Sequence, residues 1–312
     1  MAFMRGAGAA CRVRPRACLA ILFLTRMRHT LYRWLLLLLS MFVLGPIAGI
    51  MAGSLRATDG GPQTSLLVND SLVMGLLVTL GVFFLAAIAG IAGSFISGLR
   101  HGMLCTGLVL AWAAWGMGQI DRILHHTQSA STMYALSAEG VLVGLLSIAL
   151  AAVLVLIARQ PAPEPELAPH HHTPEPRSLV DKATPMALAA SLVVAGIIAW
   201  LVAQDTLKGQ TFAAAALAGM FGATAGRLTA SAASALTFVV AIVLLAIASP
   251  LIATFMHSSP IGPTRAALAG TLFPLARLLP LDWAAGAFVG IPLGLSWATS
   301  LVDKHGHAPA TA

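Results

Sequence analysis

Four polar residues have side chains of the kinds that bind metal ions. Asp121 and His125 are four residues apart, His126 follows directly, and His257 comes much later in the chain. Residues four apart on a helix share one face, and carboxylate and imidazole groups are common ligands of zinc and of haem iron. These four side chains are therefore candidate ligands of a metal or haem-edge site. The sequence favours the other interpretation, that they are interfacial polar residues that anchor helix ends.

The other chemistry-bearing residues indicate no catalytic machinery. The run His170–His172 is typical of loose metal binding or of a solvated spacer. The three cysteines, Cys11, Cys18 and Cys105, form neither a CxxC motif nor a disulfide framework. The sequence contains no P-loop, HExxH or GxGxxG motif. We therefore predict neither catalytic residues nor a cofactor, and the sequence favours a role other than that of an enzyme.

The helices that would position these residues can be predicted from the composition, which is unusually rich in apolar residues and poor in charged ones. The 312-residue chain is 58% hydrophobic and only 9% charged, with a mean hydropathy of +0.87. Soluble domains contain about 25% charged residues, so this composition excludes a soluble globule, and its hydrophobicity excludes disorder over most of the length. The sequence predicts an integral membrane protein in contact with lipid. The formal net charge of +7 is then a topology signal rather than a nucleic-acid footprint, because no aromatic residues are interleaved with the basic ones.

Apolar windows predict an all-α polytopic bundle with about eight transmembrane helices, within a range of seven to nine. A crossing needs roughly 20 apolar residues. The eight windows are 34–53, 72–97, 103–120, 140–158, 186–204, 211–226, 231–256 and 283–302. Pro46, Pro250 and Pro292 lie within three of them, where we expect broken or kinked helices. The apolar segment 266–281 is interpreted as re-entrant or interfacial, with a ninth span as the alternative.

These windows divide the chain into five parts. A basic segment, 1–33, precedes a first four-helix half, 34–158; a Pro-, Glu- and His-rich linker, 159–185, leads to a second half, 186–302, and a tail, 303–312. Met27 is an alternative start, and the residues after it also resemble a signal peptide.

Basic residues predict the orientation in a bacterial inner (plasma) membrane. Placing the N-terminus in the cytoplasm puts 13 of the 18 Lys and Arg residues inside and 5 outside. The C-terminus is then cytoplasmic as well. Seven of those 13 residues precede the first window, so the prediction depends mainly on them.

Two ladders of small residues predict close helix packing. Small side chains four residues apart let another helix backbone approach. The ladders are Ala86, Gly90, Ser94 and Gly98, and Ala214, Ala218, Gly222 and Gly226. Their likeness suggests a 4+4 repeat, although Gly- and Ala-rich helices resemble one another in any case. Such faces would also suit a protein partner or a second copy of the chain.

The function that we expect is transport of a small or apolar solute. The alternative is a non-catalytic scaffold, assembly factor or accessory subunit of a membrane complex. Charged residues lie almost only at the ends of the predicted spans, which argues against a proton-coupled carrier with a buried acid. A polar cavity between the halves would favour transport, and solid packing would favour the scaffold.

Overall fold

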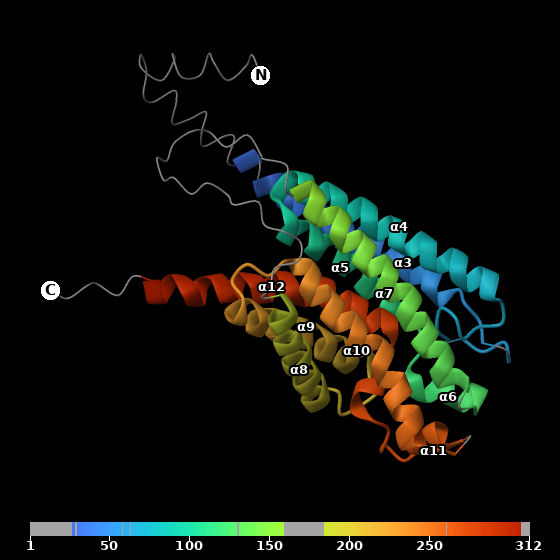
Figure 1. Ribbon diagram of the computed structural model, residues 1–312. Coiled ribbons are helices and arrows are strands. Elements are labelled where there is room, and N and C mark those ends of the chain that lie inside the picture. The colour runs from blue at the N-terminus through green and yellow to red at the C-terminus, as the bar shows by residue number, and fades with distance from the viewer. Residues whose placement is uncertain are drawn as a thin grey trace, which may run out of the picture.

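The computed structural model describes residues 27–28, 30–57, 59–62, 64–129, 131–158, 184–259 and 261–306, and the side chains only up to 301 in the last range. These residues form helices and connecting loops, with no strand among them. Most of the basic segment, the linker with His170–His172 and the end of the tail lie outside the described residues. Figure 1 shows two groups of helices, α3–α7 and α8–α12, and α12 of the second group lies next to the first.

The first group begins with a helical stretch, Thr30–Gly53, that contains the π-helical turn η1 (Ser40–Leu44) and α3 (Gly45–Gly53). It continues with α4 (Leu72–Ser97), α5 (Leu99–Gly116), α6 (Ile120–Thr127) and α7 (Ser131–Ala158). The second group consists of α8 (Thr184–Val202), α9 (Lys208–Thr229), α10 (Ala235–Met256), α11 (Gly262–Leu268), η2 (Pro274–Arg277) and α12 (Pro280–Gly306).

Within the part of the chain that the structure describes, six helical stretches are long and apolar enough to cross a membrane: Thr30–Gly53, Leu72–Ser97, Ser131–Ala158, Thr184–Val202, Ala235–Met256 and Pro280–Leu301. The pair α5 and α6, bent by 42°, would make a seventh. Their outer faces carry exposed apolar side chains such as Ile50, Phe84 and Phe255, as expected for contact with lipid tails. The helical membrane class is therefore confirmed, whereas eight crossings and the 4+4 repeat are not.

The predicted window 211–226 corresponds to α9, which has 22 residues but is not among the six apolar helices. Alanine and glycine make up much of α9, and both are less apolar than the Leu, Ile and Val of the other spans. This helix packs extensively on both α12 and α8. Protein therefore covers much of the surface that lipid would cover on a more apolar helix.

Proline affects the helices less than we expected. Both α10 and α12 continue through Pro250 and Pro292. One turn after each proline a hydroxyl bonds back to the proline's own carbonyl group: Thr254 donates to Pro250 O at 2.9 Å, and Ser296 donates to Pro292 O at 2.8 Å. Before Pro46 the chain widens into the π-turn η1, a common accommodation of a missing N–H.

The segment 266–281 forms no helix of spanning length. It contains the end of α11, the 3₁₀ turn η2 and the first residues of α12. Nevertheless Leu272, Leu275 and Leu279 are almost fully buried. A ninth span is therefore not formed, and the segment is a folded connection packed inside the bundle.

Candidate functional site

The four predicted metal ligands lie at one end of the bundle. Asp121, His125 and His126 belong to α6, and His257 follows the last residue of α10. The rings of His125 and His126 meet edge to face, with centroids 5.9 Å apart. Among the described residues, no three His, Cys, Asp or Glu side chains are arranged to hold a metal ion. The metal site stays a prediction.

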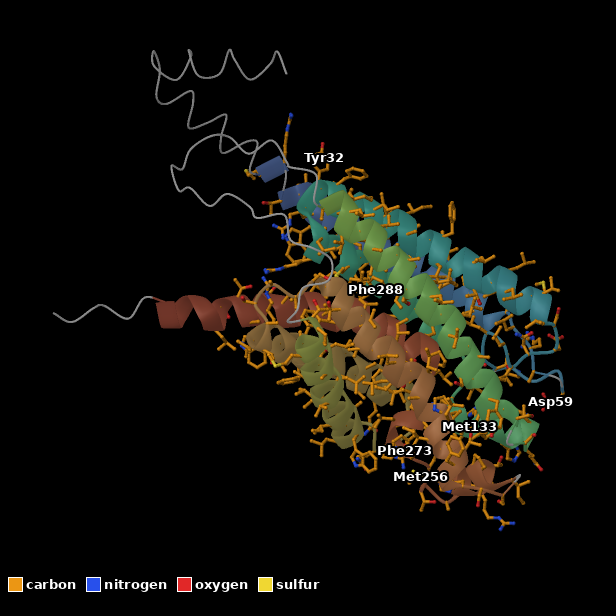
Figure 2. All side chains as sticks on the ribbon, viewed as in Figure 1. Tyr32, Asp59, Met133, Met256, Phe273 and Phe288 are labelled. Atoms are coloured by element: carbon orange, nitrogen blue, oxygen red, sulfur yellow. The ribbon has the colours of Figure 1, made fainter. Side chains whose placement is uncertain are left out.

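One of these histidines is tied to the loop between α3 and α4. The Nδ1 atom of His126 pairs with Asp59 Oδ2, and the Gly61 N–H donates to Asp59 Oδ1 at 2.9 Å. The hydrogen bond from Gly61, assisted by His126, lowers the pKa of Asp59. Asp59 lies at the edge of the molecule (Figure 2), so this contact joins two surface elements rather than forming a buried site.

A buried acid lies where the sequence predicted only a helix end. The predicted span began at Gly140, but α7 begins at Ser131, so Glu139 lies about 12 Å along the helix at 1.5 Å per residue. Its side chain has no exposed surface. The Leu67 N–H donates to Glu139 Oε2 at 2.9 Å, whereas Oε1 has no hydrogen-bond partner. The expectation that the spans lack a buried acid is therefore wrong.

A second acid, Asp282, is held in the first turn of α12. Lys208 Nζ lies 3.4 Å from Asp282 Oδ1 and 3.5 Å from Oδ2, and the Leu279 N–H donates to Oδ2 at 3.0 Å. The side chains of Lys208 and Asp282 are only 10% and 1% exposed, respectively. This position suits a carboxylate, because the N-terminus of a helix carries a partial positive charge.

The two acids and the lysine form one electrostatic cluster. Glu139 interacts at longer range with both Lys208, which attracts its charge, and Asp282, which repels it. Glu139 comes from α7, in the first group of helices, whereas Lys208 and Asp282 begin α9 and α12 in the second. We name Glu139, Lys208 and Asp282 the ionisable cluster. It is the only place in the described residues where buried ionisable side chains from both groups interact in this way.

Arg277 supports the chain that leads into Asp282. The Arg277 guanidinium, 7% exposed, donates to Leu272 O at 3.2 Å, Gly270 O at 2.8 Å, Ala203 O at 3.2 Å and also Gln204 O. Burial lowers the pKa of Arg277, and Asp205 opposes that effect. The carbonyl groups at 203 and 204 directly follow the last residue of α8, so the arginine joins that negative helix end to the connection before α12.

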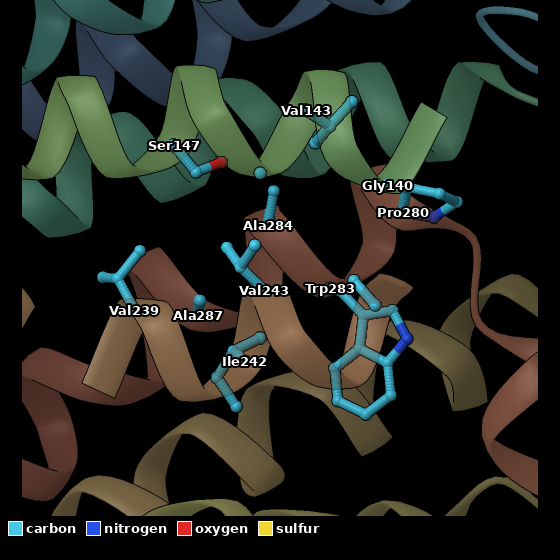
Figure 3. A pocket seen from close by; sticks show the side chains of 12 residues that line it. Gly140, Val143, Ser147, Val239, Ile242, Val243, Pro280, Trp283, Ala284 and Ala287 are labelled. Atoms are coloured by element: carbon cyan, nitrogen blue, oxygen red, sulfur yellow. The ribbon is translucent and has the colours of Figure 1, made fainter. Parts of the chain in front are cut away.

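Next to the cluster, α7, α10 and α12 leave only a small cavity. Its volume is about 10 Å³, and it is lined by Gly140, Ser147, Val243, Ala246, Trp283 and other apolar residues. Figure 3 shows Pro280 and Trp283 close to Gly140 across this junction. A space of that size holds about one water molecule. The described interface between the two groups is therefore closely packed in this conformation.

The ladder on α4 contacts the next helix, α5. A methyl group at Gly90 would meet Thr106 Oγ1 and would lie 3.4 Å from Gly102 O, and a methyl group at Gly102 would in turn meet Ser94 Oγ. Ala86 is fully buried, and its carbonyl accepts a hydrogen bond from Thr106 at 3.3 Å. Gly98, with φ +79°, forms the turn into α5 instead, a backbone conformation that favours glycine.

The ladder on α9 contacts the preceding helix, α8. Methyl groups at Gly222 and Gly226 would lie 3.0 Å from Ser191 O and 2.9 Å from Ala187 O. Ala214 and Ala218 are fully buried. The two ladders therefore contact different partners, the following helix in one case and the preceding helix in the other, which a simple duplication would not predict.

No family model, curated protein or solved structure matches this chain.

Proposed function

We propose that the chain is a transporter for a small solute in a membrane, with the ionisable cluster at the interface between its two groups of helices. The observation that carries the proposal is the fully buried Glu139 carboxyl, which interacts at longer range with the Lys208–Asp282 ion pair. Ionisable groups are costly to bury in a membrane span and usually mark a route for a solute or an ion. Several helices of membrane-spanning length support the same class of protein.

Two features of the proposed membrane arrangement go beyond the six or seven apolar helices described above. We propose that α9 crosses the membrane as well, shielded by α8 and α12. We also propose that the termini lie in the cytoplasm of a bacterial cell, because seven arginines precede the first span. Transport would then require the groups to move relative to each other, since the junction of α7, α10 and α12 is closed in this conformation.

A flux assay tests transport directly. The purified full chain is reconstituted in vesicles loaded with a defined mixture of small metabolites, and the loss of each is followed by mass spectrometry. We expect at least one solute to leave faster than from protein-free vesicles. If every solute leaves at the protein-free rate, the proposal is wrong for that mixture's chemical classes.

A crosslink tests the movement. A methyl group at Gly144 would lie 3.5 Å from Val243 Cβ, a separation that suits a disulfide. Oxidised Gly144→Cys/Val243→Cys protein should lose its solute flux and regain it on reduction, whereas Val243→Cys alone should respond to neither treatment. Unchanged flux in the crosslinked protein would overturn movement between α7 and α10.

A membrane scaffold is the second candidate, and the close packing of the interface favours it. Both small-residue ladders are occupied within the chain, so a partner would contact the exposed apolar faces instead. Purification in mild detergent distinguishes the two. A scaffold should co-purify with one membrane protein in fixed proportion and show no solute flux.

A further inference from the structure

The ionisable cluster contains two acids but only one base. If Glu139, Lys208 and Asp282 were all charged, one negative charge would remain uncompensated in a buried site. Such a charge is far costlier to bury than a neutral carboxyl group. We propose that the cluster is a proton-binding site whose proton resides on Glu139, and, resting on the proposed function, that this proton is the coupling ion of transport.

The contacts of the two acids assign the proton to Glu139. Asp282 has the ammonium group of Lys208 at 3.4 Å and a backbone N–H at 3.0 Å, so both interactions favour its ionised form. Glu139 has one backbone N–H on Oε2 and the neutral hydroxyl of Ser65 nearby, and Oε1 has no partner within hydrogen-bond distance. An unpartnered oxygen is tolerable on a neutral carboxyl group and unfavourable on a carboxylate.

The surroundings of Glu139 supply no other compensating charge. Neither α4 nor α10, which pack against α7, contains an ionisable residue. From α12 the charged group near Glu139 is Asp282, and from α9 it is Lys208. On α5, Arg100 bonds instead to Ser296 and Thr299, about four turns along α12 from Asp282, His101 follows Arg100 directly, and Cys105 is a thiol that carries no positive charge. Lys208 is thus the cation available to both acids.

Loss of the proton changes which groups attract one another. The Glu139 O–H bond breaks, the electron pair stays on the carboxylate, and the proton passes to water. The Lys208 ammonium, still charged, then attracts the Glu139 carboxylate on α7 as well as Asp282 on α12, while the two carboxylates repel each other. Because the two acids belong to different helix groups, proton occupancy biases how α7 sits against α9 and α12.

Infrared spectroscopy of the purified full chain tests the site without any solute. At neutral pH the wild type should show the carbonyl stretch of one protonated carboxyl group, which shifts in heavy water and disappears on raising the pH. Glu139→Gln should remove the band, whereas Asp70→Asn, at an exposed acid, should retain it. Glu139→Asp should move the band rather than abolish it, which excludes misfolding as the cause of its loss.

The proposal is overturned if the wild type shows no such band, or if the band persists in Glu139→Gln and vanishes in Asp282→Asn. Together with the flux assay, the infrared result distinguishes failure of the proton-site proposal from failure of the transport proposal. A band without solute flux retains the proton site and refutes transport. Solute flux that is independent of a proton gradient, with no band, retains transport and refutes the proton site.

Discussion

Lys208 and Asp282 form a buried ion pair, with Nζ 3.4 Å from Oδ1, between the first turns of α9 and α12. The two ends are not equivalent, because a helix N-terminus favours Asp282 but disfavours a lysine by about 0.3–1 kcal/mol. The position of Lys208 is therefore explained by its partner on α12 and not by its own helix. The pair thereby joins the starts of two helices that are 74 residues apart in sequence.

Breaking this pair from one side should be strongly destabilising. Lys208→Met leaves Asp282 charged and buried, and the loss of one member of a buried pair costs about 3–5 kcal/mol. The double variant Lys208→Met/Asp282→Asn should be more stable than the sum of the two single effects predicts. Equilibrium unfolding in mixed detergent micelles measures the three variants. Strict additivity would contradict an interaction between these residues.

Arg277 should not be replaceable by lysine. Its planar guanidinium reaches carbonyl groups on both sides, at Ala203 and Gly270 among others, and a single ammonium group has no comparable fork. Each lost hydrogen bond to a charged group costs about 1.5–3 kcal/mol, so Arg277→Lys should lower the free energy of unfolding by at least about 3 kcal/mol. The same micelle unfolding assay measures it.

The exposed Arg265, in α11, provides the matched control. Arg265→Lys should change the free energy of unfolding by less than about 0.5 kcal/mol, as is usual for surface substitutions. If both arginine variants behave alike, the clamp of Arg277 on the backbone carbonyl groups contributes little.

Apolar windows predicted the helical membrane class but not the site. The window for α7 began at Gly140, because the residues before it include Ser, Thr, Tyr and Glu. The helix itself begins nine residues earlier, at Ser131, because backbone hydrogen bonding continues where the sequence becomes polar. Glu139 is buried by contacts with other segments, and a hydropathy window holds no information about such contacts. Its contact with Leu67 spans 72 residues. The useful signal was an acid within one turn of a predicted span.

The spacing of the ladders can be read from the sequence, since helix periodicity is a local property. Small residues at every fourth position do lie against neighbouring backbones, as at Gly90 and Gly222. The spacing did not predict which helix each ladder contacts. It also did not predict that Gly98 follows the end of α4 with a positive φ. Both depend on how the connections turn.

The turn around Asp59 should loosen in acid. Its pKa is lowered in the folded protein, first by the Gly61 N–H and then by His126, so the fold favours the carboxylate form. The contribution is therefore fully present above the ordinary Asp pKa of about 3.9 and is lost as the pH falls through the lower folded value. Hydrogen exchange of peptides from the α3–α4 loop, compared between wild type and Asp59→Asn at each pH, should be slower in the wild type above this range, and the difference should disappear in acid. An equal difference at every pH would contradict this mechanism.

The interface of α9 and α12 should not tolerate even one added methyl group. A Cβ atom at Gly290 would meet the carbonyl oxygen of Ala216 and would lie 2.7 Å from Met220 N, and neither backbone atom can rotate away. Gly290→Ala should therefore push the helices apart at a cost of about 1–3 kcal/mol, or more. Gly209→Ala, in the first turn of α9, would meet nothing within 4 Å. It should be neutral or stabilising by up to about 1 kcal/mol, because alanine favours helix over glycine. Thermal unfolding in detergent distinguishes the two, and equal melting temperatures would mean that the helices are not in contact through Gly290.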